Sequence, residues 1–485
     1  MIVAANRGPV TYERVADGSL AARRGAGGLV TALRGLIAAG ELTWIASALS
    51  EADREVAASH PEGRLEELAG GVARVRLLAH DPTAYQRYYG EVANPTLWFT
   101  QHQLWNLPYE PAFGSEFRVA WDQGYDAVNT AFGTAVADQL ASRPDAPVVV
   151  HDYHLYLAPR AIRERAAAAC LASFVHIPWP SPDALRVLPK QIVEALLTSM
   201  LMCDLVGFHT ERWRDNFAAC CVELLGARNP EPGVIDQAGR STRLSARPIS
   251  VSPTELRTSA EASEVAREGE ALQPAPGEKL IVRIDRTDPS KNVLRGFEAF
   301  ELLLAENPEH RGHVRMLALL NPSREDVPAY AEYRAAIDAA AARVNARFGI
   351  EGWQPVYLDV ADNFARSLAA YQLYDVLFVN PVLDGLNLVA KEGPLLNQRG
   401  GTVVLSDNAG AHAELGDHVI SVNPFDIAEQ ARALDLALTL EEDERRQRSR
   451  ALCAAIESRP IEAWSDGLLS DLAEAVQAGG RTITT

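Results

Sequence analysis

The sequence predicts an α/β protein, and three observations lead to this prediction. Short β-branched runs recur, each followed by a polar or glycine-rich turn and a helical pattern: PVVVHD (147–152), ASFVHIP (172–178), KLIVRID (279–285), VLFVNP (377–382) and GTVVLSD (401–407). These runs are continuously apolar, which is typical of parallel strands covered on both faces. The chain has 485 residues, which is too long for one ordinary core, so two domains are expected.

The boundary between the domains is expected near residue 245. The segment 243–278 contains LSARPISVSPTEL, a charged run and QPAPGEKL, a change of composition that is typical of a domain junction. We therefore expect an N-terminal domain over 1–245 and a C-terminal domain over 246–460, whose first strand is 280–284. A helical pattern over 461–479 follows the second domain.

Charge and composition exclude several classes of protein. The net charge of −18 argues against binding to nucleic acid or to an anionic membrane, because both need a basic surface. The stretch IVEALLTSMLMCDLVGF is broken by Glu194 and Asp204 and is too short for a membrane span of about 20 residues. Arg7 interrupts the apolar start of the chain, so no signal peptide is expected. Five cysteines without CxxC spacing indicate a reduced, cytoplasmic protein.

Polar residues follow the predicted strands directly. In open α/β sheets, ligands bind beyond the carboxyl ends of the strands. His151 and Asp152, His176, the segment 283–291, the segment 384–392 and the segment 406–410 all lie at such positions. Two sheets of this kind facing each other would enclose a cleft between the domains.

Two motifs are suited to binding phosphate. ARRGAGGL (22–29) precedes an apparent helix, and its glycines would let backbone N–H groups approach an anion. A structural turn is the alternative, because the motif lacks the GxGxxG spacing. RTDPSKN (286–292) follows a strand and carries Arg286 and Lys291. Together these cations would neutralise a diphosphate, and the alternative is an exposed cap with solvated charges.

Two further groups of residues suit a phosphorylated sugar. HDYH (151–154) and FVHIPWP (174–180) lack the spacing of a metal site, so no metal is expected, and Asp152 and His176 suit hydrogen bonds to sugar hydroxyls. A structural histidine is the alternative. YYGEVANPTLW (88–98) and NPSRED (321–326) supply Tyr89, Trp98 and Arg324. The aromatic rings would form a flat apolar surface against a sugar ring, and the arginine would donate paired hydrogen bonds to its phosphate. Packing or surface positions are the alternatives.

In order along the chain, the motifs NRGPV, GGL, YYGEVANPTLW, HDYHL, HIPWP, RTDPSK, NPSRED, DGLNLVAKE and LSDNAGA resemble those of the trehalose-6-phosphate synthase family. The resemblance covers residues 2–426. It implies a GT-B fold, with two Rossmann-like domains facing each other across a cleft and the segment 461–485 crossing back to the first domain. It also implies transfer of glucose, with retention, from a nucleotide-diphosphate glucose to glucose 6-phosphate, without a cofactor.

The resemblance implies a role for each matching residue. For the acceptor, the contacts would be Arg7, Tyr89, Trp98 and Arg324 around the phosphate and Asp152 on the sugar. For the donor, they would be Gly27, Gly28, His176, Arg286, Lys291, Asp384, Asn387, Leu388, Val389, Ala390, Lys391 and Glu392. Among these, Asp384 would hold the hydroxyls of the transferred glucose, and Asn387 would begin a helix, so that the backbone of residues 387–390 approaches the phosphates. Glu392 would bind the ribose diol. For Lys391, the alternative is an ion pair with an acidic residue nearby. The catalytic group would be Asp152, His176, Arg286, Lys291 and Asp384.

The identity of the donor base and two rival functions stay open. Leu383 replaces an arginine that many relatives have, and the segment 357–367 does not align with their base-binding segment. Only four of the 46 basic residues are lysine, which indicates a GC-rich genome and favours GDP-glucose over UDP- or ADP-glucose. One rival is a pseudo-glycosyltransferase that couples a cyclitol nucleotide to an aminocyclitol phosphate, although its known members differ around the VAKE segment. The other rival is a non-catalytic sugar-phosphate sensor. A homo-oligomer is neither predicted nor excluded.

Overall fold

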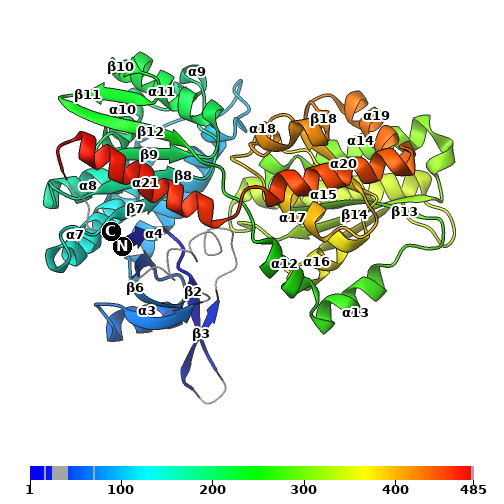
Figure 1. Ribbon diagram of the computed structural model, residues 1–485, viewed down its shortest axis with the longest axis horizontal. Coiled ribbons are helices and arrows are strands. Elements are labelled where there is room, and N and C mark those ends of the chain that lie inside the picture. Colours follow the sequence, from blue (N-terminus) through cyan, green and yellow to red (C-terminus); the bar gives the residue numbers. More distant parts are fainter. Residues whose placement is uncertain (16–17, 25–41, 69–70, 482–485) are drawn as a thin grey trace. The chain divides into compact units, whose positions relative to one another are not determined.

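The computed structural model describes residues 1–15, 18–24, 42–68 and 71–481. The chain divides into two compact units. The N-terminal unit comprises Met1–Ile249 together with Ile461–Thr485, and the C-terminal unit comprises Ser250–Pro460. Figure 1 shows a β-sheet with helices packed on it in each unit.

Within the described residues, the N-terminal unit contains a ten-stranded sheet with the order β10-β11-β12-β9-β8-β7-β1-β4-β6-β5. The strands from β12 to β6 in this order are parallel, and antiparallel pairing occurs at both edges. The strands are β1 (Ile2–Ala4), β4 (Leu42–Ser47), β5 (Arg64–Leu68), β6 (Gly71–Leu78), β7 (Val148–His151), β8 (Leu171–Val175), β9 (Leu205–Phe208), β10 (Arg228–Glu231), β11 (Val234–Gln237) and β12 (Arg240–Ala246). A separate hairpin pairs β2 (Val10–Arg14) with β3 (Leu20–Arg24).

In the described part of the N-terminal unit, some helices begin at a residue whose side chain satisfies a free backbone N–H group. The Ser50 side chain accepts a hydrogen bond from the Asp53 N–H in a capping box, and Thr210 caps α11 in a similar way. The helices are α3 (Glu51–Ser59), α4 (Pro82–Gln86), α5 (Phe99–Gln101), α6 (Ser115–Ala120), α7 (Ala127–Ser142), α8 (Ala158–Arg165), α9 (Pro182–Leu185), α10 (Lys190–Met200), α11 (Glu211–Leu225) and α21 (Glu462–Ala478), with a 3₁₀ turn η3 (Tyr153–Leu155).

Among the described residues of the N-terminal unit, two segments are π-helical: η1 (Arg87–Trp98) and η2 (Trp121–Asp126). Pro95 lies inside η1 and cannot donate a backbone hydrogen bond. The Thr96 hydroxyl bonds to the Glu91 carbonyl at 2.9 Å, which satisfies an acceptor in the widened turn. Wide turns of this kind often occur at functional sites, and η1 carries the predicted residues Tyr89 and Trp98.

In residues 250–460, all of which are described, a six-stranded parallel sheet has the order β15-β14-β13-β16-β17-β18. Its strands are β13 (Lys279–Arg286), β14 (Val314–Asn321), β15 (Val356–Val360), β16 (Val376–Val379), β17 (Thr402–Ser406) and β18 (Ile420–Val422). The strand order reverses between β13 and β16. Loops on the two sides of such a switch point diverge and leave room for a ligand.

The helices of the C-terminal unit bury an apolar core against this sheet, with Phe297, Phe300 and Ile337 fully buried. They are α12 (Pro253–Ala260), α13 (Ser263–Leu272), α14 (Val293–Glu306), α15 (Pro328–Phe348), α16 (Phe364–Leu373), α17 (Val389–Leu396), α18 (His412–Leu415), α19 (Ile427–Thr439) and α20 (Glu442–Glu457), with 3₁₀ turns η4 (Pro289–Lys291), η5 (Pro308–His310) and η6 (Gly416–His418).

The structure confirms the predicted α/β class. Each of the five β-branched runs contains a strand, namely β7, β8, β13, β16 and β17 in chain order. The strand predicted at 280–284 lies within β13. In all of these strands except β13 every residue is buried, and in β13 only the two end residues are not. Burial on both faces therefore explains why the runs lack alternation.

The helix α21 belongs to the N-terminal unit, although it follows the C-terminal unit in the sequence. Its Leu468 and Leu472 are fully buried. Trp464 packs edge-on against Phe174 of β8, with the ring centroids 5.1 Å apart. Arg247 forms two hydrogen bonds of 2.6 Å to the carboxylate of Asp471. Both apolar burial and an ion pair therefore hold this helix to the sheet, and Figure 1 shows it beside β8 and β9.

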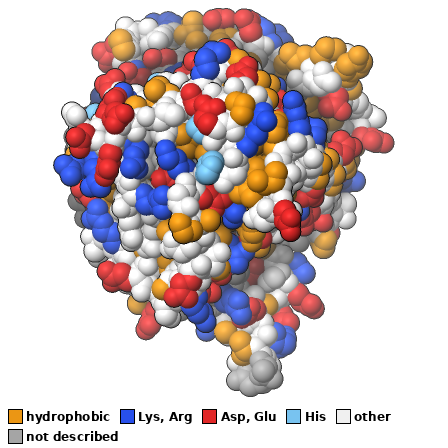
Figure 2. Space-filling view, turned by 90° about the vertical axis from the view of Figure 1, so that its right-hand side faces the viewer, with side chains coloured by type: hydrophobic (Ala, Val, Ile, Leu, Met, Phe, Trp, Pro, Cys, Tyr) orange, Lys and Arg blue, Asp and Glu red, His pale blue; other side chains and the backbone are white. Residues whose placement is uncertain are grey.

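In the described part of the chain, no helix combines the length and the apolar character that crossing a membrane requires. On the face drawn in Figure 2, acidic and basic side chains are interspersed among apolar and neutral ones. That face offers no continuous basic surface to a polyanion.

We predict that Leu468→Ala will destabilise the N-terminal unit by about 2–5 kcal/mol, because it removes a fully buried side chain and leaves a cavity. Urea unfolding followed by tryptophan fluorescence measures the change. Asp466→Ala, at an exposed position of the same helix, is the control and should change the stability by less than about 0.5 kcal/mol. Equal effects of the two substitutions would contradict the packing of α21 described above.

Candidate active site

In the N-terminal unit, the predicted residues Asp152 and His176 lie together after the adjacent strands β7 and β8. The Asp152 N–H donates to the Phe174 carbonyl at 2.8 Å, and its carboxylate accepts from the His176 N–H at 3.2 Å. Asp152 has φ 72° and ψ 171°, a conformation that is almost restricted to glycine. A strained aspartate that is held at a strand end is typical of a functional position.

The His176 ring is paired with the ring of His151. His151 Nδ1 and His176 Nε2 are 3.0 Å apart. Burial lowers the pKa of His176 to about 3, and burial together with the neighbouring His176 lowers the pKa of His151 well below its usual value. Both rings are therefore neutral at pH 7, so His176 is suited to hydrogen bonding and not to charge stabilisation.

In addition to Asp152, three predicted acceptor contacts lie in the N-terminal unit. The partly buried Tyr89 stacks between Tyr85 and His154, at centroid distances of 5.8 and 5.9 Å. Trp98 is 5% exposed and stacks on His102 at 3.9 Å, so most of its ring serves packing. Arg7 is exposed.

Arg7 lies close to Tyr85. Burial raises the pKa of the Tyr85 hydroxyl, and the positive charge of Arg7 opposes this increase. Arg7 and Tyr89 therefore both lie beside Tyr85, whereas Trp98 is buried.

The fifth predicted acceptor contact, Arg324, lies in the C-terminal unit, after β14. Its guanidinium is 3.1 Å from the carboxylate of Asp288 and also bonds to the Tyr330 hydroxyl. Arg286, a predicted donor contact, is 3.7 Å from the same Asp288 oxygen. The fully buried Asp288 therefore lies beside two arginines that the sequence assigned to different substrates.

The sequence alone indicates no role for Asp288, although this residue lies inside the RTDPSKN motif. Locally, its carboxylate accepts hydrogen bonds from the N–H and hydroxyl groups of Ser290, at 3.0 and 2.7 Å. Such a bond is the usual role of aspartate at a helix start. Its contact with Arg324 spans 36 residues of sequence, so no local signal could have revealed it.

The C-terminal unit also brings together Lys291 and Asp384. These residues follow the paired strands β13 and β16, and the ammonium group of Lys291 forms an ion pair with Asp384 Oδ2. The Asn387 amide donates to the same oxygen at 3.1 Å. The predicted leaving-group cation and the predicted sugar-binding carboxylate are therefore direct neighbours.

The buried Arg283 stabilises the turn that carries Lys291. It donates to the Lys291 carbonyl at 3.0 Å and to the Asp285 carboxylate at 2.8 Å. Burial raises the pKa of Asp285, while the charges of Arg283 and Lys291 lower it. A side chain at position 296 would collide with this guanidinium, because a Cβ there would lie 2.1 Å from it. Gly296 therefore leaves the space that Arg283 occupies.

The loop after β16 differs in one detail from the sequence prediction. Asn387 was expected to begin a helix, but its φ of 84° is left-handed, and α17 begins at Val389. The Asn387 side chain instead accepts from the Ala390 N–H at 3.3 Å. The segment 387–390, predicted to approach the donor phosphates, is thus a capped turn leading into a short helix.

A second loop packs directly on this turn. The Gly410 N–H donates to the Asp384 carbonyl at 3.0 Å. A Cβ at position 410 would lie 2.0 Å from the Gly385 carbonyl oxygen. Only glycine fits here, so the LSDNAGA motif serves to bring two loops together.

Lys391 and Glu392 have different surroundings. Lys391 is 2% exposed and forms a 2.6 Å ion pair with Glu414, which also pairs with Arg459 at 2.8 Å. Burial lowers the pKa of Lys391, and Glu414 opposes this change. The Glu392 carboxylate accepts from the Tyr371 hydroxyl at 3.1 Å, and burial raises its pKa. The acidic neighbour considered for Lys391 is therefore present.

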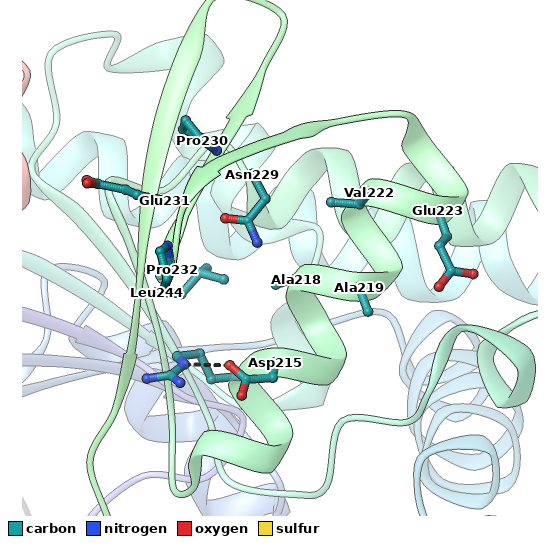
Figure 3. A pocket seen from close by; sticks show the side chains of 12 residues that line it. Asp215, Ala218, Ala219, Val222, Glu223, Asn229, Pro230, Glu231, Pro232 and Leu244 are labelled. Carbon is teal, nitrogen blue, oxygen red and sulfur yellow. Dashed lines mark hydrogen bonds and ion pairs between the residues drawn. The ribbon is translucent and has the colours of Figure 1, made fainter.

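Two predicted residues, Gly27 and Gly28, lie outside the described residues. In the described part of the chain, no group of three or more His, Cys, Asp or Glu side chains could hold a metal ion. A pocket of about 680 Å³ lies between α11 and the β10–β11 hairpin (Figure 3). None of the residues that line this pocket is a predicted site residue.

Comparison with known proteins identifies the family. The model of glycosyltransferase family 20 matches residues 1–474. The chain belongs to glycosyltransferase family 20. Its two parallel-sheet units are those of the GT-B fold, and family membership makes it a nucleotide-sugar glycosyltransferase.

Three relatives illustrate the range of this family. Validamine 7-phosphate valienyltransferase of Streptomyces hygroscopicus subsp. jinggangensis is 34% identical, over 98% of this chain and 94% of that protein. A UDP-forming α,α-trehalose-phosphate synthase of Burkholderia xenovorans, solved in complex with glucose-6-phosphate, is 28% identical with a TM-score of 0.81, covering 97% of this chain and 99% of that one. A structure from E. coli bound with UDP-2-fluoro glucose is also 28% identical, with a TM-score of 0.81 and coverage of 97% and 98%.

In this family 20 chain, we predict that Lys391→Met will destabilise the C-terminal unit by about 3–5 kcal/mol, because it leaves the Glu414 carboxylate without its buried partner. The double variant Lys391→Met with Glu414→Leu removes both charges and should regain most of this loss. Chemical denaturation measures both values. If the double variant were as unstable as the single one, the ion pair would not be the reason for burying Lys391.

Proposed function

We propose that this chain is an α,α-trehalose-phosphate synthase. It transfers glucose, with retention, from a nucleotide-diphosphate glucose to glucose 6-phosphate and gives trehalose 6-phosphate. The observation that carries the proposal is the cluster at the switch point of the C-terminal sheet. There Lys291 pairs with Asp384, and Arg286 and Arg324 lie beside Asp288. A diphosphate leaving group needs such cations, and a transferred sugar needs such a carboxylate.

The proposed donor contacts are those expected from the sequence, and the ion pairs of Arg286, Lys291 and Asp384 support the part of them that lies in the C-terminal sheet. Arg286 and Lys291 neutralise the diphosphate as charge develops on it, and the backbone of Gly27 and Gly28 approaches the same group. His176 and Asp384 hold the hydroxyls of the transferred glucose. The turn 387–390 offers backbone N–H groups to the phosphates, and Glu392 accepts hydrogen bonds from the ribose diol. Lys391 acts indirectly, since its ammonium group is bound to Glu414.

The proposed acceptor contacts are those predicted from the sequence. Arg7 and Arg324 bind the phosphate of glucose 6-phosphate, Tyr89 and Trp98 form the wall of its site, and Asp152 accepts from a sugar hydroxyl. We accordingly propose that residues 1–245 form the acceptor domain and residues 246–460 the nucleotide-sugar domain. The hydrogen bond from the His176 N–H orients the Asp152 carboxylate.

The proposed chemistry places few demands on protein side chains. The bond between the anomeric carbon and the diphosphate oxygen breaks, and the acceptor oxygen bonds to the same face of that carbon. The departing phosphate oxygen takes the proton of the acceptor hydroxyl. The protein contributes positioning and charge neutralisation, in keeping with the neutral state of His176.

A second candidate function is favoured by one comparison. The valienyltransferase relative is 34% identical, so coupling of a cyclitol nucleotide to an aminocyclitol phosphate is the alternative. Against it stand Lys391 and Glu392 of the VAKE segment, both retained here, and the buried Lys391–Glu414 pair that fixes this segment.

An assay with three donors tests the proposal. The purified protein is incubated with glucose 6-phosphate and GDP-, UDP- or ADP-glucose, and release of nucleoside diphosphate is followed. Composition favours GDP-glucose, whereas the B. xenovorans relative is UDP-forming, so the three donors are compared directly. Release that depends on glucose 6-phosphate supports the proposal. No turnover with any donor contradicts it, and calorimetric binding without turnover would indicate a sensor.

We predict that Lys291→Ala chiefly lowers kcat with the preferred donor, by about 10- to 100-fold, because a charge-assisted bond contributes about 1.5–3 kcal/mol. Steady-state kinetics under saturating substrates measure this change. Lys190→Ala, at a lysine whose side chain is 84% exposed, is the control and should match the wild type. A kcat within twofold of the wild type in Lys291→Ala would remove this residue from the leaving-group site.

Arg324→Ala should instead chiefly raise the KM for glucose 6-phosphate, by about 10-fold or more, because it removes one charged donor from the acceptor phosphate. The control is Arg448→Ala, whose partner Glu444 lies one turn away on the surface of α20. An unchanged KM would exclude Arg324 from the acceptor site.

A further inference from the structure

The ring of His151 is the neighbour of the ring of His176, which is a proposed substrate contact. One nitrogen of the His151 ring, Nε2, is buried. His151 is 1% exposed. Its Nδ1 lies 3.0 Å from His176 Nε2. Its other nitrogen, Nε2, is buried and has no hydrogen-bond partner among the described residues. This asymmetry restricts where the two rings carry their protons.

Two neutral imidazoles that share one hydrogen bond can be arranged in two ways. If His176 Nε2 donates, His151 Nδ1 accepts, and His151 must carry its own proton on the buried Nε2 as an unpaired N–H group. If His151 Nδ1 donates, the buried Nε2 is an unprotonated nitrogen. Unpaired buried N–H groups are the rarer case in proteins, so the second arrangement is favoured.

We infer that His151 is a positioning residue that holds His176 in the tautomer with its proton on Nδ1. His176 Nε2 then accepts from His151, and His176 Nδ1–H is the donor available to an oxygen of the transferred sugar. This inference deepens the proposed function and rests on it for the statement that His176 contacts the sugar. The assignment of the tautomer itself depends only on the residues around the pair.

The surroundings of His176 hold its ring in place. Phe174, His209 and Trp464 lie around it, with centroid distances of 4.9, 5.2 and 6.3 Å. Asp152 holds the His176 backbone N–H, so the consecutive residues His151 and Asp152 fix the ring and the main chain of His176 respectively. A ring held in this way keeps one nitrogen toward His151 and the other away from it.

Nitrogen NMR of the full-length protein labelled with ¹⁵N-histidine tests the tautomer without substrate. Two-bond nitrogen–proton correlations distinguish the two neutral tautomers, and His176→Gln assigns the signals. We expect the Nδ1–H tautomer for His176 in the wild type. The Nε2–H tautomer, or a mixture of the two, would overturn the inference whatever reaction the enzyme catalyses.

Two substitutions separate hydrogen bonding from packing. In His151→Asn, the amide nitrogen lies near the position of Nδ1 and can still donate to His176, whereas His151→Leu has a similar volume and cannot. We expect the Asn variant to keep the His176 tautomer and the Leu variant to lose it. In the synthase assay, kcat should fall about three- to tenfold in the Leu variant and recover in the Asn variant, with an unchanged KM for glucose 6-phosphate.

Equal kcat values in the two variants, whether both reduced or both normal, would overturn the positioning role. If no donor supports turnover, the proposed function fails, but the NMR result still decides whether His151 sets the tautomer. The two failures are therefore distinguishable.

Discussion

The ion pair between Lys291 and Asp384 is the interaction on which the site in the C-terminal unit depends. It exists because β13 and β16 are parallel neighbours, so the loops that follow them meet at one edge of the sheet. Arg283 fixes the carbonyl of Lys291, and Asn387 bonds to the same Asp384 oxygen as the ammonium group. A cation held in this way is already oriented before a ligand arrives, which lowers the cost of ordering it during the reaction.

Much of the fold and part of the site could be predicted from the sequence. The strands were predictable because burial on both faces leaves continuous β-branched runs. The strand-end rule also placed Asp152, His176 and Lys291 correctly in the segments that follow strands β7, β8 and β13. Asp288 was missed because its nearest contact, to Ser290, is an ordinary cap, and its contact with Arg324 depends on the pairing of β13 with β14.

Lys391 and Arg324 show a second limit of sequence patterns. Lys391 lies inside a motif that suits a donor site, yet its charge is used by Glu414, which is 23 residues away in the sequence. Arg324 was grouped with Arg7, but the two arginines belong to different units. A motif shows that a residue is near a site, whereas its partner depends on the folded chain. The tautomer inferred for His176 is likewise set by a contact of the folded chain. It depends on the buried Nε2 of His151, which has no hydrogen-bond partner among the described residues.

The position of α21 has a consequence for the synthesis of the protein. Trp464 packs against Phe174 and lies beside His176, but the ribosome makes it only after the whole C-terminal unit. Domains commonly fold in the order of their synthesis, yet the N-terminal unit lacks part of its core until α21 has been synthesised. The residues around His176 therefore take their final arrangement after translation of the C-terminal unit, and a nascent chain that stops at Pro460 lacks Trp464 beside this histidine.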